Sequence, residues 1–372
     1  MNSDYKGIIK EALQVNIVTL VVVSVIYLCS PLLFSILSTK QDETWLLSKY
    51  VSMRNNRDLE KYCDKVVICD ISGVGTRDSI VSILGTLQSY APAAIGCDII
   101  FPQTSLNDPA ADTALANAVA SFPAMVMAAR PVYDATGNIM HVEESFFESK
   151  YKGDVTVYPD GKFNFTSNGL PYISFPCMLA QVAKGDEIDY PKRKFSINYA
   201  SRFIKAMPID ELRKEDVEGK VVLMGDKNDL RDYIDLKFVL FDRNYNQQGT
   251  TVNRVAGILL HAYATAAILE EDWVIIIPGW ISLLIGFIAA FSLSILTRYW
   301  RLKRWKLAYM KILQYLFILF MIWVCYPIYK NFNLIFNPLY FTIAIAMYDY
   351  SYAILDISKT IVGKIGKLIK RC

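Results

Sequence analysis

Four apolar segments near the two ends of the chain constrain its fold more than any other feature. A helix needs about 20 apolar residues to cross the hydrocarbon core of a bilayer. The sequence holds four segments of roughly this length, at residues 17–37, 273–296, 312–329 and 334–355. We therefore predict four transmembrane helices, one before and three after a long central region.

The first segment has features of a secretory signal, but two observations argue against cleavage. Its apolar core is too long for a signal peptide, and no cleavage site of small residues follows it. We expect it to remain as an anchor in the membrane.

The basic residues between and after the spans predict how the chain is oriented. Short loops rich in lysine and arginine stay in the cytoplasm. Residues 297–311 contain TRYWRLKRWK, with five basic residues and no acid, and residues 356–372 form a second basic segment. Both should be cytoplasmic, which puts residues 1–16 inside and residues 38–272 outside the membrane.

The tail at residues 356–372 has isoleucines and a leucine on one face of a predicted helix, with lysines elsewhere. A basic amphipathic helix binds an anionic membrane surface. Docking to a cytoplasmic partner is the alternative use of the same segment.

Composition excludes few classes of function. The net charge is +3 and charged residues make up 20% of the chain, so no basic excess predicts binding to nucleic acid. The seven cysteines show no CxxC or Cys/His spacing, so we predict no metal site and no cofactor. Cys69 and Cys97 lie in apolar runs typical of strands. Buried free thiols are expected for them, although disulfides among the external cysteines stay open.

The central region alternates between strand and helix patterns. The runs KVVICDIS, AAIGCDIIF and PAMVMAA are separated by two segments with helical spacing of apolar residues, 75–90 and 107–122. Asp108 is expected to cap the second of these helices. Residues 131–170 interrupt the pattern as an insertion of short strands and loops. The alternation resumes after this insertion. It comprises a helix at 175–184, strands KFSINYA and VVLMGD, a polar loop at 226–238 and a helix at 253–270. This alternation predicts an α/β domain with a mostly parallel sheet.

Three of these strands end in an acid: Asp70, Asp98 and Asp226. In open parallel sheets, ligands bind outside the carboxyl ends of the strands. We therefore expect the three acids to surround one crevice.

Five segments carry a resemblance to a known family. KVVICDIS, AAIGCDIIFP, NDPAADTALANAVAS, KVVLMGDKND and AGILLHAYATAAIL occur in the family's order and spacing. Over roughly residues 40–275 the sequence resembles the type 2 CHASE domain, the bacterial cyclase/histidine-kinase-associated sensory extracellular domain. The resemblance implies one span before the domain, about three after it, and signalling as a homodimer.

The resemblance also implies a function. Members sense signals outside the cell and control a cytoplasmic output, so we expect an inner-membrane receptor with a periplasmic sensory domain. This chain departs from the family pattern because SGVGTRDS replaces the usual tryptophan-rich stretch, and because only DISKTIVGKIGKLIKRC follows the last span. Output should then come from a separate partner. The alternative is a structural or accessory subunit of a membrane complex that senses nothing.

Five residues are candidates for contact with a ligand: Asp70, Ser72, Asp98, Asp226 and His261. The acids could hold a cation or ligand, or could accept hydrogen bonds from loop backbone and cap the next helices. His261 could sense protons or contact a ligand, or could be a packed helix residue. No nucleophile motif such as G-x-S-x-G accompanies these residues, so we predict no catalysis.

Overall fold

The computed structural model describes residues 7, 9–22, 24–25, 50, 62–105, 108–158, 162–163, 172–185, 195–199, 203–242, 244, 250–302 and 307–369. The chain divides into two compact units. One contains Met1–Leu46 and Ile276–Cys372, and the other contains Leu47–Ile275. The second unit therefore corresponds closely to the predicted external domain.

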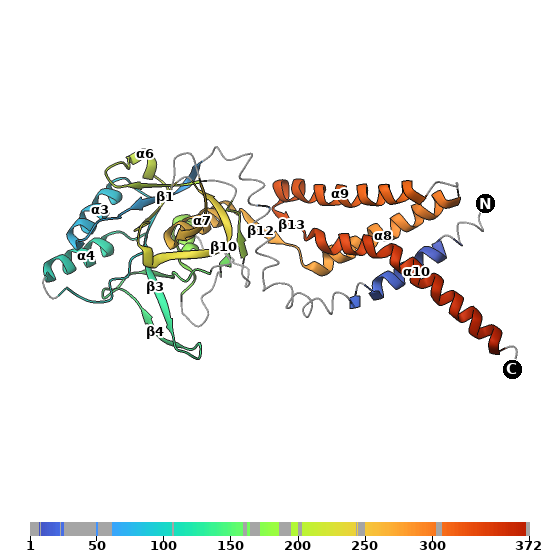
Figure 1. Cartoon of the computed structure of the whole chain (residues 1–372). Helices are drawn as coiled ribbons and strands as arrows, with labels where there is room; N and C mark the ends of the chain where they lie inside the picture. The colour runs from blue at the N-terminus through green and yellow to red at the C-terminus, as the bar shows by residue number, and fades with distance from the viewer. Residues whose placement is uncertain are drawn as a thin grey trace. The chain divides into compact units, whose positions relative to one another are not determined.

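A seven-stranded sheet forms the centre of the second unit (Figure 1). Its order is β4-β3-β2-β9-β1-β8, and β5 pairs with β3. The strands are β1 (Tyr62–Asp70), β2 (Ala94–Cys97), β3 (Met125–Tyr133), β4 (Ile139–Glu143), β5 (Tyr151–Asp154), β8 (Phe203–Pro208) and β9 (Val221–Gly225). The β3–β4 pair is antiparallel and the other pairs are parallel. The mostly parallel α/β sheet agrees with the sequence pattern.

Helices cover both faces of this sheet. Their bounds are α3 (Arg77–Ser89), α4 (Pro109–Ser121), α5 (Phe175–Lys184), α6 (Lys214–Val217) and α7 (Gly257–Glu270). In β1, Val66 and Ile68 join the core beneath α5 and α7, while Val67 and Cys69 join the core beneath α3 and α4. Two buried faces explain why the central strands are almost continuously apolar. Each fully buried aliphatic side chain contributes about 1.5–3 kcal/mol.

The helices facing the carboxyl edge begin at defined caps. The Thr76 hydroxyl accepts a hydrogen bond from the Ser79 N–H at the start of α3. Asp108 accepts one from the Ala111 N–H at the start of α4, as predicted, and Pro109 occupies the first turn. These caps fix where each helix begins relative to the strand before it.

The structure corrects several predicted elements of this unit. The KFSINYA run contributes β7 (Phe195–Ile197) to a small antiparallel sheet with β6 (Lys162–Phe163) and β12 (Trp273–Ile276), not to the central sheet. The central sheet instead contains β8, which pairs with β1 and which the sequence pattern missed. The region 131–170 is also more than an insertion, since β5 joins the central sheet in parallel with β3. Strands β5 and β8 lie at the periphery of the sheet and contain both polar and apolar residues. They therefore lack the continuous apolar run by which the central strands were predicted.

Two further corrections concern the polar loop and the last helix of the domain. Part of the predicted loop forms η1 (Leu230–Asp232) and the start of β10 (Tyr233–Asp242), which pairs antiparallel with β11 (Thr250–Ala256). The helix predicted from residue 253 therefore begins only at Gly257. The residues before it lie in strand β11, paired with β10, instead of on a helix face.

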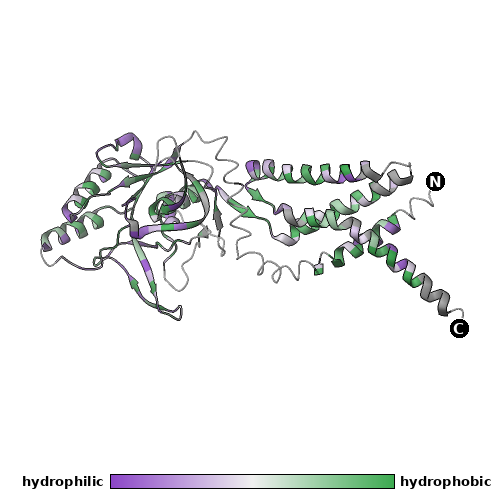
Figure 2. Ribbon diagram, viewed as in Figure 1, coloured by the Kyte–Doolittle hydropathy of each residue, from purple (hydrophilic) through white to green (hydrophobic). Residues whose placement is uncertain are grey.

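The first unit is helical. Residues 9–22 form a helix, followed later in the chain by α8 (Gly279–Leu302), α9 (Leu307–Phe332), β13 (Leu334–Ile335) and α10 (Pro338–Ile369). Apolar residues predominate over long stretches of these helices (Figure 2). The second predicted span begins at Gly279 instead of residue 273, since residues 273–276 are in β12. The fourth begins at Pro338, and its helix includes much of the predicted tail.

Two helices within the described residues are long and apolar enough to cross a membrane. These are α8 over Gly279–Leu296 and α9 over Lys311–Phe332. Most of the first predicted span lies outside the described residues, and α10 is not among the two. Four spans therefore remain a prediction, of which two have structural support.

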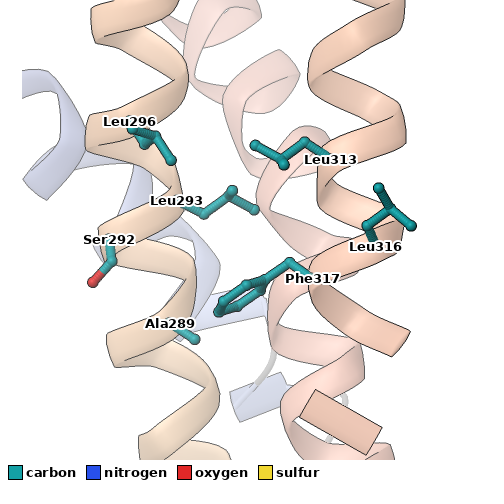
Figure 3. A pocket seen from close by; sticks show the side chains of 7 residues that line it. All are labelled: Ala289, Ser292, Leu293, Leu296, Leu313, Leu316 and Phe317. Carbon is teal, nitrogen blue, oxygen red and sulfur yellow. The ribbon is translucent and has the colours of Figure 1, made fainter. Parts of the chain in front are cut away.

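Helix α8 packs differently against its two neighbours. A Cβ atom added to Gly286 would lie 2.6 Å from Phe341 Cα, so glycine permits close approach of α10. Toward α9, a cavity of about 390 Å³ opens, into which Leu293, Leu313 and Phe317 project (Figure 3). Helix α9 is tied to α10 instead, through a 3.0 Å hydrogen bond from Gln314 Nε2 to the Ile345 carbonyl.

Candidate functional site

The strand-end acids gather at one edge of the central sheet. β9 lies between β1 and β2, with Gly225 paired to Asp70 and Met224 paired to Cys97. Because the three strands are parallel and in register, Asp70, Asp98 and Asp226 emerge at the same edge. The sequence pattern therefore predicted their common location.

Ser72 links two of these acids. Its hydroxyl oxygen lies 2.5 Å from Asp70 Oδ1 and 2.6 Å from Asp226 Oδ1. The Ser72 N–H also donates to Asp70 Oδ1, at 3.0 Å. A hydroxyl carries a single proton, so it can donate fully to only one carboxylate at a time. The cluster Asp70–Ser72–Asp226 thus contains two acceptors that compete for one donor.

Lys227 supplies the positive charge of this cluster. Its ammonium lies 3.3 Å from Asp70 Oδ2, and its backbone N–H lies 3.4 Å from Asp70 Oδ1. Burial by itself would raise the pKa of the Asp70 carboxyl, but the hydrogen bonds from Ser72 and the charge of Lys227 lower that pKa below its ordinary value. Asp70 is therefore a buried carboxylate that its surroundings keep ionised.

Asp98 has the opposite environment. Its N–H donates to the Met224 carbonyl at 2.9 Å, which holds the turn after β2 against β9. Loss of water around the carboxyl raises its pKa well above the ordinary value, and the nearby charge of Asp232 raises it further. Asp98 therefore retains its proton to higher pH than Asp70.

Asp232 is the partner that the sequence pattern missed. It lay in the predicted polar loop, yet its Oδ2 accepts a 3.0 Å hydrogen bond from the Gly257 N–H at the start of α7. The residue keeps exposed surface, but its carboxylate faces the helix start and loses water there. This desolvation raises the pKa of Asp232 to about 6, despite the hydrogen bond from Gly257. Asp98 and Asp232 form a second carboxyl pair.

Two glycines allow this close packing. A Cβ on Gly257 would lie 2.8 Å from Asp232 Oδ2, and a Cβ on Gly225 would lie 2.6 Å from Ile258 Cδ1 and 3.3 Å from Asp98 Cβ. A side chain at Gly225 would separate β9 from the start of α7, and one at Gly257 would push the Asp232 carboxylate away from that helix. The AG at the head of AGILLHAYATAAIL was the available sequence signal for Gly257.

His261 lies apart from the acids in its contacts. It is buried in α7, with its ring centroid 5.4 Å from that of Phe175 and 6.0 Å from that of Phe163. Burial lowers the pKa of His261 to about 3, against a hydrogen bond with the Val155 backbone. The imidazole is thus neutral at physiological pH, which fits the packed-residue alternative better than a proton sensor.

A fourth strand-end acid was not predicted. Asp154 ends β5, is buried, and accepts hydrogen bonds from the Thr156 N–H and hydroxyl at 2.9 and 2.6 Å. The sequence GDVT repeats the pattern of CDIS at Asp70, an acid followed two residues later by a hydroxyl. This repeat was the signal that could have found it.

The cysteines of the domain behave as buried thiols. Cys63, Cys69, Cys97 and Cys177 are all buried. Burial raises the pKa of Cys69, Cys97 and Cys177 to about 12, which leaves them unreactive. Among the described residues, one group could hold a metal: Cys63, Asp64 and Glu270, with ligand atoms within 4.8 Å of one another. It offers one ligand fewer than a closed structural zinc site.

The domain's family follows from its sequence. The model of the CHASE2 domain matches residues 25–296, well over half of the chain. The chain belongs to the CHASE2 domain family. CHASE2 is a family of sensory extracellular domains, which agrees with the resemblance carried by the five segments. No curated protein and no solved structure matches the chain.

Membership in a sensory family suggests that the carboxyl edge of the sheet binds a ligand. A sensory CHASE2 domain must bind or respond to something, and this edge provides four carboxyl groups, of which Asp70 has a lowered pKa and Asp98 a raised one. Carboxylate oxygens and a lysine can bind a ligand that brings complementary groups.

Proposed function

We propose that this protein is a receptor of the bacterial inner membrane that detects a signal with its periplasmic CHASE2 domain. Its N- and C-termini are cytoplasmic, and it acts on a separate partner protein, not on a substrate of its own. The observation that carries this proposal is the CHASE2 match over a compact α/β unit whose chain continues directly into apolar helices. The basic residues at 297–311 support the orientation.

The orientation is tested with reporter fusions. Alkaline phosphatase, which is active only in the periplasm, is joined after residue 272, after residue 306 and after residue 372. We expect activity from the first fusion alone. Activity from the second or third fusion would contradict the proposed topology and would show that fewer than four segments cross the membrane.

Helix α7 offers a route from the edge of the sheet toward the membrane helices. Asp232 holds its first residue, and its last residue is followed in the chain by β12 and then by α8, which begins at Gly279. A signal that changed the charge or position of Asp98 and Asp232 would move the start of α7. Such transmission requires the signal to favour one of two conformations.

The partner is sought by purification. We expect the chain, extracted in mild detergent, to retain a kinase, a cyclase or another signalling protein, and to crosslink as a homodimer. Stoichiometric recovery with a transporter or protease, unaffected by small molecules, would instead support the accessory-subunit alternative.

A further inference from the structure

A cavity of about 660 Å³ lies beside the first turns of α4. Its volume is within the range of about 300–1,000 Å³ found for small-molecule sites. Three separate segments line it: the connection from β2 to α4, the start of α4, and the connection from β4 to β5. The lining residues are Thr104, Ser105, Pro109, Asp112, Thr113, Ala116, Phe146 and Phe147.

An internal ion pair supports the wall of this cavity. Arg77, at the start of α3, forms a salt bridge with Asp112, whose residue is only 5% exposed. Arg77 Nη2 donates to the Gln103 carbonyl at 2.6 Å, and the Ser105 N–H donates to Asp112 Oδ2 at 2.6 Å. The carboxylate that faces the cavity is therefore already neutralised and held in place.

Aromatic rings complete the site. The Arg77 guanidinium lies 5.2 Å from the ring centroid of Phe146 and 5.9 Å from that of Phe101. Phe146 and Phe147 meet edge to face, with centroids 5.0 Å apart. The Phe146 N–H donates to the Phe101 carbonyl at 2.8 Å, which joins two lining segments. The rings are thus fixed before any ligand arrives.

We infer that this cavity binds a small uncharged polyhydroxylated ligand, a saccharide. Arg77 and Asp112 neutralise one another, so the wall of the cavity offers no unpaired charge to a cationic or an anionic ligand. A neutral ligand leaves the ion pair intact. Hydroxyl groups can donate to Asp112 and exchange hydrogen bonds with the side chains of Ser105 and Thr113, while an apolar ring face packs on the phenylalanines.

A saccharide would be the signal of the proposed receptor, so its biological role rests on the proposed function. Binding itself can be measured whatever the membrane topology is. The full chain is placed in phospholipid nanodiscs, because many common detergents carry sugar headgroups. Calorimetry then compares neutral glucose, galactose, mannose and maltose with glucosamine and glucuronate, which add a positive or a negative charge to the same ring.

We expect at least one neutral sugar to bind with a Kd below about 1 mM, and its charged analogues to bind at least about tenfold more weakly. The variant T113W fills the cavity and should weaken binding by about tenfold or more. T86W is the matched control, since Thr86 also lies on a helix and donates to the carbonyl four residues before it, as Thr113 does. F146L removes one ring without adding bulk and should also weaken binding.

Three results would overturn the inference. They are the absence of heat from every neutral sugar at about 10 mM, tighter binding of glucosamine or glucuronate than of glucose, and equal binding by wild type and T113W. Circular dichroism of each variant shows that it is folded. A failed reporter-fusion experiment with intact sugar binding would reject the receptor topology alone.

Discussion

Asp70 and Asp98 occupy equivalent places in the sheet but have opposite surroundings. Each lies at the end of a strand that pairs with β9. Hydrogen bonds from Ser72 and the charge of Lys227 lower the pKa of Asp70, whereas loss of water, together with the charge of Asp232, raises the pKa of Asp98. A strand-end pattern thus determines where an acid lies, and the groups packed around it, both near and distant in sequence, determine whether it carries a charge.

The largest loss of stability is expected from substitution of Asp70. Asp70→Asn removes the charge that Ser72 and Lys227 stabilise, so we expect the domain to lose about 2 kcal/mol of stability at pH 7. Urea denaturation of the full chain in detergent measures the change. Asp78→Asn in the exposed first turn of α3 is the control, with a cost of only a few tenths of a kcal/mol from the helix dipole. Equal costs for the two variants would contradict the assignment of Asp70 as a stabilised carboxylate.

Asp98→Asn should stabilise the domain at pH 7, whereas Asp70→Asn should destabilise it. An acid whose pKa is raised on folding contributes least when the pH exceeds its unfolded value of about 3.9, because folding then requires uptake of a proton. We expect the variant to match wild type at pH 3 and to be more stable by about 1 kcal/mol at pH 7. Denaturation at both pH values tests this. Destabilisation at pH 7 alone would show that Asp98 is ionised and paired.

Asp232→Asn tests the pH range over which the Asp98–Asp232 pair reduces the stability of the domain. Since the pKa of Asp232 is about 6, the wild type should lose stability between about pH 4 and 7 relative to this variant. Solvent screens the exposed part of this residue, so we expect a difference of less than about 1 kcal/mol. A flat difference from pH 4 to pH 7 would exclude the shift.

Lys227→Met gives the smallest effect. The lysine side chain is 23% exposed, so loss of its salt bridge should cost about 0.5 kcal/mol. The same variant should raise the pH at which Asp70 titrates. If that titration is unchanged, the hydrogen bonds from Ser72 and from the Lys227 backbone lower the pKa of Asp70 without help from the ammonium charge.

Local sequence patterns predicted the frame of the domain. Continuous apolar runs identified β1, β2, β3 and β9, and the spacing of Ile80, Ile83, Leu84 and Leu87 identified α3. The cap at Asp108 was also predicted, because a capping acid followed by proline is a local signal. The parallel sheet and the position of three acids followed from these elements.

The pairing of side chains was not predictable in the same way. Asp232 lies in a polar stretch with no periodic pattern, and its role depends on the hairpin that brings it to Gly257. Strand β8 is also only partly apolar, since it pairs with β1 at the edge of the sheet. Such contacts between distant segments determine protonation but leave no mark in a short window of sequence.

The most direct test of this account is the order in which Asp70 and Asp98 lose their protons. Aspartate labelled with ¹³C at the carboxyl carbon is titrated by NMR in the full chain, and the two signals are assigned by their loss in Asp70→Asn and Asp98→Asn. We predict that Asp70 titrates below the ordinary range of aspartate and that Asp98 titrates well above it. The same titration midpoint for both, or the reverse order, would contradict the account.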